Sequence, residues 1–298
     1  FMLRRIIRLQ PMVVLSVIIG AIAYLLQGSV HWDGTPVPFH WVLVALILGL
    51  FMIPVLPGAA ADVRGNGEMF PLNGPTWSLF FEYIGSVLYA VILHRLSKNG
   101  LRTVVAVSGI GLAACALCNM SGAFHLGVGW SMADMGWLGG FLRLSLSFGI
   151  GLMLTRDFRP MRIRGAFWIC AALITAIMSC PYIGSTDGNP SIANGVYDII
   201  CTLLIFPTIV YIGACGTTSD IFSSKVCEFL GAISYPVYII HYPVMYMFYA
   251  WVWNNGITFA DAWPVCMALF VVIILEAWIA MKWYDAPIRR YLSRKLLH

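Results

Sequence analysis

Charged residues are scarce in this chain. Asp, Glu, Lys and Arg make up 10% of its 298 residues, whereas hydrophobic residues make up 60%. A soluble domain carries about 25% charged residues, so the composition excludes a globular domain with a single anchor and predicts a protein that crosses the bilayer several times. The net charge of +5 does not indicate nucleic-acid binding, because the basic residues lie at the ends of apolar stretches, where they set membrane topology.

The sequence also lacks internal repeats and the cysteine pattern of a metal site. Cys115 and Cys118 form a C-x-x-C motif, but neither a second pair nor a histidine at zinc spacing accompanies it. We therefore expect no metal site, no bound cofactor and no disulfide framework. We interpret the eight cysteines as small buried apolar residues.

Nine apolar stretches account for most of the chain. Most are long enough to span about 30 Å of hydrocarbon as helices. The sequence therefore predicts an all-α, polytopic membrane helix bundle. The stretches are Pro11–Leu26, Trp41–Leu56, Thr76–Leu93, Thr103–Met120, Leu138–Leu154, Gly165–Cys180, Val196–Cys215, Leu230–Val252 and Ala262–Trp283.

Basic residues cluster in alternate polar segments, which the positive-inside rule places in the cytoplasm. Both chain ends are then cytoplasmic in a plasma (inner) membrane, and the loops at Asp187 and Asn255 are external. Arg64 is the exception to this pattern. The basic segments contain Arg4, Arg5 and Arg8; Arg95, Lys98 and Arg102; Arg156, Arg159, Arg162 and Arg164; Lys225; and Arg289, Arg290, Arg294 and Lys295.

Three apolar stretches lie between the first two basic segments, although the chain must cross an even number of times there. Trp41–Leu56 is the best candidate for a stretch that does not cross, because it is short and ends in Pro54 and Pro57. With the polar segment Gly58–Pro75 it would form a re-entrant or cavity-lining element. We therefore predict about eight spanning helices plus one re-entrant or partial helix. The alternative is that the charge pattern misleads at one loop.

A carboxylate stands within the third apolar stretch. An ionised Glu near the middle of a membrane helix costs a few kcal/mol, so such residues usually face a bundle interior or a water-filled cavity. Ser78 and Glu82 are four residues apart and share a helical face, flanked by Trp77. We expect them to face a cavity in the outer half of the membrane, where Glu82 could orient a hydroxyl substrate or an imidazole. The alternative is a carboxylate that only locks helix packing.

A histidine lies deep in the eighth stretch. Ser234, Tyr238 and His241 are spaced so that they form one stripe on a helix. Pro236 and Pro243 loosen that helix and free backbone carbonyls for other partners. His241 could act as base, acid or hydrogen-bond donor. The alternative is a histidine that serves packing alone.

A basic turn opens the chain. Arg4, Arg5 and Arg8 precede Pro11, and guanidinium groups bind phosphates through paired hydrogen bonds. This turn could hold a phosphorylated substrate, and the alternative is a topological anchor. Three further ionisable residues lie within apolar stretches: Arg143, Asp198 and Glu276. We expect the arginine to pair with one of the two carboxylates in a structural role.

Four segments combine these features in order: Arg4-Arg5-Ile6-Ile7-Arg8-Leu9-x-Pro11, Trp77-Ser78-Leu79-x-x-Glu82, Ile233-Ser234-Tyr235-Pro236-x-Tyr238-x-x-His241-x-Pro243 and Asp285-x-Pro287-x-Arg289. They resemble the acyltransferase-3 family of membrane O-acyltransferases, with matching order and spacing along essentially the whole chain, residues 1–298. The resemblance implies about ten membrane helices with both ends cytoplasmic. It also implies transfer of an acyl group, often acetyl, from cytoplasmic acyl-CoA to a hydroxyl of a surface or secreted glycan.

At its N-terminus we expect this chain to differ from the family that it resembles. In the family, two further helices precede the basic motif, and the first carries an Arg and a His thought central to catalysis. The basic motif arrives here at Arg4, so we expect an N-terminally truncated member that is inactive by itself. His241 matches the family's late motif and does not inherit the role of the early His.

We therefore expect an integral membrane O-acyltransferase whose partners are acyl-CoA, a glycan or lipid-linked sugar acceptor and the lipid bilayer. The expected site residues are Arg4, Arg5 and Arg8 for the CoA phosphates, Trp77, Ser78, Ser234 and Tyr238 for the acceptor side, and Glu82 and His241 in supporting catalytic roles. The rival interpretation is a transporter or flippase of a lipid-linked or small anionic molecule, a class that often shows inverted repeats. A non-catalytic subunit is a third alternative.

Overall fold

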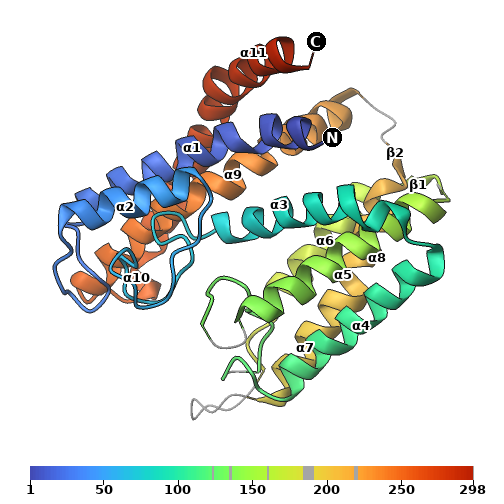
Figure 1. Ribbon diagram of the computed structural model, residues 1–298, viewed down its shortest axis with the longest axis horizontal. Coiled ribbons are helices and arrows are strands. Elements are labelled where there is room, and N and C mark those ends of the chain that lie inside the picture. Colours follow the sequence, from blue (N-terminus) through green and yellow to red (C-terminus); the bar gives the residue numbers. More distant parts are fainter. Residues whose placement is uncertain (123, 134–135, 160, 184–190, 218–220, 298) are drawn as a thin grey trace. The chain divides into compact units, whose positions relative to one another are not determined.

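The computed structural model describes residues 1–122, 124–133, 136–159, 161–183, 191–217 and 221–297, and these are mostly helical (Figure 1). Each of the nine apolar stretches contains a helix, which confirms the all-α class. Two parallel two-residue strands, β1 (Ile163–Arg164) and β2 (Gly216–Thr217), form the sheet in the described part. Asp187, which we predicted to be external, lies outside the described residues.

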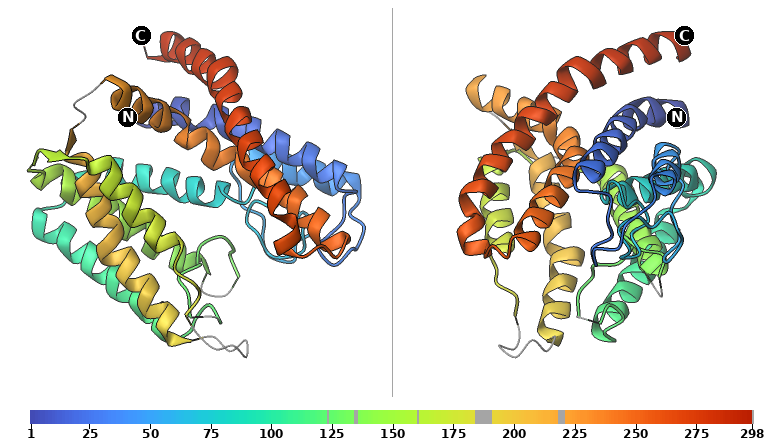
Figure 2. Two further views of the ribbon diagram at one scale, coloured as in Figure 1. Left: turned by 180° about the vertical axis from the view of Figure 1, so that it is seen from behind. Right: turned by 90° about the vertical axis from the view of Figure 1, so that its left-hand side faces the viewer.

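The helices follow the apolar stretches closely. They are α1 (Met2–Leu26), α2 (Phe39–Leu50), α3 (Thr76–Val91), α4 (Lys98–Leu117), α5 (Gly136–Asp157), α6 (Ala166–Met178), α7 (Ile192–Ile200), α8 (Phe206–Ala214), α9 (Ile221–Asn254), α10 (Phe259–Ala280) and α11 (Ala286–Leu296). A 3₁₀ turn covers Leu93–Arg95. Wide π-helical turns join α7 to α8 (Cys201–Ile205) and α10 to α11 (Met281–Asp285), so that each pair forms one continuous helix, and the second pair is visibly bent (Figure 2).

Five helical segments of the described chain are long and apolar enough to cross a membrane, fewer than the eight that we predicted. They are Met2–Leu26, Lys98–Leu117, Gly136–Asp157, Ile192–Ala214 and Phe259–Leu296. Helix α2 has 12 residues and is therefore about 18 Å long, shorter than the hydrocarbon core. That length fits the partial element predicted there. Whether α2 crosses the membrane stays a prediction.

The chain, which we treated as one domain, packs as two compact units. Unit 1 comprises Phe1–Val87, Trp130–Ala133 and Cys227–His298, and unit 2 comprises Leu88–Gly129 and Asp134–Val226. In unit 1, α1 lies beside α2 and contacts α11 (Figure 1). A Cβ on Gly20 would clash with the carbonyl of Leu72, so this glycine lets the loop before α3 approach α1 closely.

A buried asparagine ties the parts of unit 1 together. Pro243 has no N–H, so the carbonyl of Ile239 one turn earlier lacks its helical donor. Asn73 Nδ2 donates to that carbonyl at 3.0 Å and to Ser16 Oγ at 2.8 Å. Asn73 is fully buried, and it thereby links the loop before α3 to both α1 and α9. The prediction that a proline in α9 frees a carbonyl for another partner is confirmed at this position.

The arginine that broke the charge pattern is not a topological anchor. Arg64 is 1% exposed, and its Nε donates to the carbonyl of Pro71 at 2.6 Å. Its guanidinium carbon lies 3.6 Å from the ring centroid of Tyr246 and 4.8 Å from that of Trp32, within cation–π range. Arg64 therefore belongs to the core of the long loop between α2 and α3, where the positive-inside rule does not apply.

Unit 2 is built mainly from the apolar faces of α4, α5 and α7. Leu112, Ala116 and Leu146 are buried in its core. Arg143 Nη1 donates to the carbonyl of Leu126 at 3.1 Å, and Asp198 accepts from the N–H of the same residue at 2.9 Å. Arg143 and the carboxylate of Asp198 are thus linked through the backbone of Leu126. The other proposed partner, Glu276, belongs to unit 1.

Candidate functional site

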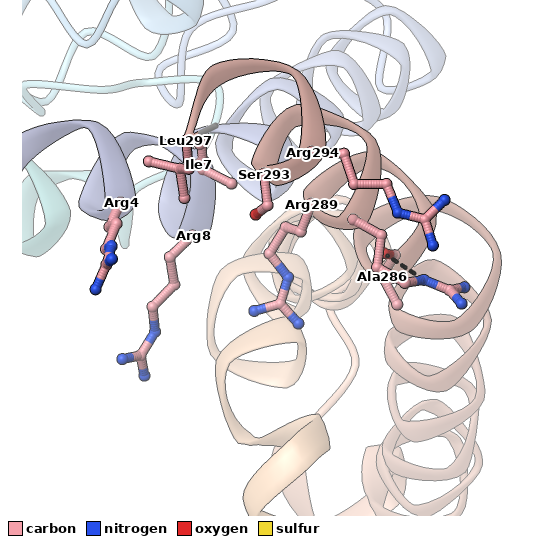
Figure 3. A pocket seen from close by; sticks show the side chains of 9 residues that line it. Arg4, Ile7, Arg8, Ala286, Arg289, Ser293, Arg294 and Leu297 are labelled. Carbon is pink, nitrogen blue, oxygen red and sulfur yellow. Dashed lines mark hydrogen bonds between the residues drawn. The ribbon is translucent and has the colours of Figure 1, made fainter.

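A groove lined by arginines lies where the start of α1 meets α11 in unit 1. Arg4 and Arg8 are one turn apart on α1, and the other three arginines come from α11. The groove has a volume of about 590 Å³. Figure 3 shows Arg4, Arg8 and Arg289 extending in the same direction from the two helices. Its lining residues are Arg4, Ile7, Arg8, Ala286, Arg289, Arg290, Ser293, Arg294 and Leu297.

The π-helical turn before α11 sets the position of these arginines. Asp285, the last residue of that turn, pairs with Arg289 at 3.0 Å, and its side chain is 2% exposed. Pro287 occupies the first turn of α11, where a missing N–H costs nothing. The lining residues include no carboxylate, so the groove carries an excess of positive charge. Several guanidinium groups around one groove match phosphate groups in charge and hydrogen-bonding geometry.

Arg5 lies outside this lining and binds the carboxylate of α3 instead. Arg5 Nη1 donates to Glu82 Oε1 at 2.8 Å, with the two side chains 24% and 32% exposed. We predicted Glu82 in the outer half of the membrane, away from the basic turn. That separation is wrong, because the ion pair holds Glu82 within one side chain's length of Arg5.

Two further hydrogen bonds fasten α3 and α9 to the start of α1. Tyr83 donates to the side-chain oxygen of Gln10 at 3.1 Å, and Tyr235 donates to the carbonyl of Leu9 at 2.8 Å. Pro11, two residues later, interrupts the helical hydrogen bonding of α1 nearby. The geometry of the groove end thus depends on three helices that are widely separated in the sequence.

The predicted hydroxyl and imidazole residues partly come together. The hydroxyls of Ser78 and Tyr238 share a hydrogen bond, which joins α3 to α9. His241 lies next to Tyr238, with ring centroids 6.2 Å apart. His241 Nδ1 faces the carbonyls of Val237 and Tyr238 at 3.1 and 2.8 Å. Because carbonyls only accept, Nδ1 is the donor in these contacts, and a neutral imidazole of this tautomer has its lone pair on Nε2.

The remaining predicted residues are placed differently. Ser234 is exposed, and its hydroxyl donates to the carbonyl of Gly231 in its own helix, so no described hydrogen bond joins it to the pair of Ser78 and Tyr238. Trp77 packs edge-on against Phe81 in its own helix.

The sequence interpretation did not include the three arginines of α11 among the candidate site residues, although they line the groove. We counted Arg290 and Arg294 only as topology signals, although their spacing by four puts them on one helical face. Arg289 was noted as a topology signal and as part of the Asp285-x-Pro287-x-Arg289 motif. A repeated basic spacing on a terminal amphipathic helix was the signal that could have found them.

Comparisons with known proteins agree with this architecture. The sequence profile of the acyltransferase-3 family, described as an acyltransferase domain, matches residues 1–282. No curated protein and no solved structure matched the chain. Because the matched region covers nearly the whole chain and includes the basic turn, Glu82 and His241, this multi-pass helical protein belongs to the acyltransferase-3 family of membrane acyltransferases.

Proposed function

We propose that this protein takes part in the transfer of an acyl group, of the acetyl class, from acyl-CoA to a hydroxyl of a surface or secreted glycan. The observation that carries the proposal is the groove with five arginines between α1 and α11. CoA presents several phosphate groups, which match clustered guanidinium groups in charge and geometry. The positive-inside rule puts this end of α1 in the cytoplasm, where acyl-CoA is made available.

Acyl transfer also requires residues that bind and orient the acceptor hydroxyl near the thioester. The acceptor hydroxyl oxygen forms an ester bond with the thioester carbonyl carbon while the C–S bond breaks, and the hydroxyl proton ends on the departing CoA sulfur. We assign Ser78, Tyr238 and His241 to the acceptor side, where the Nε2 lone pair of His241 can accept a hydrogen bond from a hydroxyl. Glu82 holds the Arg5 guanidinium in place through their ion pair, a supporting role.

The test measures acyl-CoA affinity and single-turnover transfer in proteoliposomes that contain labelled acetyl-CoA and a glycan extract. Replacing two arginines of the groove, Arg8→Ala with Arg294→Ala, should weaken acyl-CoA binding by at least about 100-fold, because each hydrogen bond to a charged group contributes about 1.5–3 kcal/mol. Arg102→Ala, which removes an exposed arginine of unit 2, is the matched control and should change nothing.

Glu82→Gln separates binding from chemistry in the same assay. Gln keeps the size and a hydrogen bond to Arg5 but removes the charge, so we expect acyl-CoA affinity to stay within about threefold while transfer slows by about tenfold or more. Product that forms without acyl-CoA would contradict the acyltransferase proposal. Movement of an anionic solute across the vesicle membrane without acyl transfer would support the transporter interpretation instead.

A further inference from the structure

A polar cavity lies at the opposite end of α1 from the arginine groove. Helix α1 has 25 residues and is therefore about 37 Å long, so its two ends are separated by roughly the thickness of a membrane. His31 follows the end of α1 and lines the cavity, which has a volume of about 440 Å³. The other lining residues are Pro57, Gly58, Ala59, Ala60, Asp62, Gly65, Asn66, Gly67 and Ala133.

Two buried polar atoms in this cavity wall lack partners in the described structure. Asp62 is 3% exposed, and its Oδ2 accepts from the N–H of Gly67 at 2.9 Å and from that of Gly58 at 3.4 Å. Its Oδ1 is buried without a recorded hydrogen bond, as is Nδ1 of His31. Buried polar atoms are almost always hydrogen-bonded, so these two atoms have unused hydrogen-bonding capacity beside the cavity.

The backbone of the loop is shaped around these residues. Gly65 has a φ of +71°, and a Cβ at that position would lie 2.8 Å from His31 Nδ1. A side chain there would therefore both strain the backbone and displace the imidazole. Gly58 and Gly67, which donate to Asp62, also adopt positive φ angles. The wall of the cavity thus depends on glycine at three positions.

The charged and polar residues that line the cavity indicate which kind of ligand it could bind. The nearest arginine, Arg64, is not a lining residue, since its guanidinium is held among the rings of Tyr24, Trp32 and Tyr246. The lining residues contain no Lys or Arg, so the cavity does not suit an anion. A carboxylate, an imidazole and the amide of Asn66 together suit an uncharged ligand with several hydroxyls.

Aromatic rings connect this cavity to the residues assigned to the acceptor. Ring centroids lie 5.8 Å apart for Trp32 and Tyr246, 5.0 Å for Tyr246 and Tyr242, and 5.1 Å for Tyr242 and His241. His241 is five residues from Tyr246 and six from Tyr235, which contacts α1 near the groove. His241 therefore lies along α9 between the groove end and the cavity end of unit 1.

We propose that the cavity beside His31 and Asp62 binds a neutral sugar ring, one of whose hydroxyls donates to Asp62 Oδ1. The assignment of this sugar as part of the acyl acceptor rests on the proposed function. The donor then binds at one end of α1 and the acceptor near the other, and His241 lies along α9 between these two ends.

The test uses saturation-transfer NMR on the full chain in detergent, with a panel of methyl glycosides of a hexose, a deoxyhexose and an N-acetylhexosamine. The wild type should saturate at least one glycoside. Asp62→Asn should weaken that binding by about tenfold or more, because Asn can still accept from Gly67 but presents a donor in place of the free Oδ1. Asp261→Asn removes an exposed carboxylate of the same unit outside the cavity and should leave binding unchanged.

A second variant allows the test to be made if the first variant misfolds the loop. If Asp62→Asn lowers the melting temperature, His31→Gln tests the same cavity without touching the hydrogen bonds to Gly58 and Gly67. Equal glycoside binding in the wild type and in the folded cavity variants, or no binding of any glycoside by the wild type, would overturn the proposal. Acyl-CoA binding is measured on the same samples. If the wild type does not bind acyl-CoA, the proposed function is contradicted. If the wild type binds acyl-CoA but the cavity variants do not change glycoside binding, only the present inference is contradicted.

Discussion

The two units of this protein differ in how they treat charge. In unit 1, Asp62, Arg64 and Asp285 are buried, whereas the buried polar residues described in unit 2 are the neutral Ser108 and Asn194. Burying a charge costs several kcal/mol unless hydrogen bonds and opposite charges compensate. Each residue that we assign to donor or acceptor binding also belongs to unit 1. The energetic cost of buried charge is therefore concentrated in the unit that carries the candidate site.

Unit 2 uses its polar residues to secure loops. Asn194 bonds the backbone of Ile183 and Ser191, and Arg143 bonds the carbonyls of Leu126 and Val128. These contacts satisfy backbone groups in the loops between helices. We therefore expect changes in unit 2 to alter stability without a separate effect on acyl transfer.

The largest expected effect comes from the buried arginine of unit 1. Arg64→Ala would remove the donor to Pro71 and the cation beside Glu68, and should destabilise the protein by about 3–5 kcal/mol. The melting temperature in detergent should fall by roughly 6–20 °C. Arg143→Ala in unit 2 should cost less, about 1–3 kcal/mol, because that side chain is only partly buried. Equal losses in the two variants would erase the contrast between the units.

Two buried asparagines, one in each unit, allow the roles of the two units to be compared directly. Asn73→Ala and Asn194→Ala each remove a buried side chain that bonds backbone carbonyls, and each should cost about 1–3 kcal/mol. Asn73 holds the carbonyl of Ile239, two residues before His241, so its loss should also slow single-turnover transfer per folded molecule. Asn194→Ala should leave that rate unchanged. A slower rate in both variants, measured on folded protein at equal acyl-CoA saturation, would contradict the division of roles.

The smallest effect concerns pH. Burial raises the pKa of Glu68 above its ordinary value, and the hydroxyl of Tyr246 and the amide of Asn66 only partly oppose this. The folded state then binds more protons than the unfolded state, so stability falls as the pH rises from the unfolded pKa through the folded one. Glu68→Gln should flatten this fall in melting temperature, while Asp198→Asn in unit 2 should keep the wild-type slope. An unchanged slope in Glu68→Gln would show that Glu68 ionises without a stability cost.

Much of the fold could be predicted because membrane helices reveal themselves through local composition. All nine apolar stretches contain a helix, and the proline-freed carbonyl in α9 was expected from Pro243. The number of spans could not be obtained in the same way. Helices such as α2 are apolar but short, and whether they cross depends on their packing.

The candidate site was predictable only in part. The arginines of α1 and the hydroxyls of Ser78 and Tyr238 were identified from spacing and from the family resemblance. The pairing of Arg5 with Glu82, 77 residues apart, was missed because our topology argument placed them on different sides of the membrane. The cavity beside His31 and Asp62 was also missed, since its residues come from loops without a periodic pattern.

By itself, the sequence determined that this protein is a helical membrane protein with the motifs of an acyltransferase-3 domain, because apolar length, basic loops and motif order are all local properties of the chain. The tertiary structure alone decided that α11 completes the arginine groove, that Arg64 is a core residue and that Glu82 holds Arg5. Those outcomes depend on which distant segments pack together, and packing is set by the whole unit rather than by any one stretch of residues.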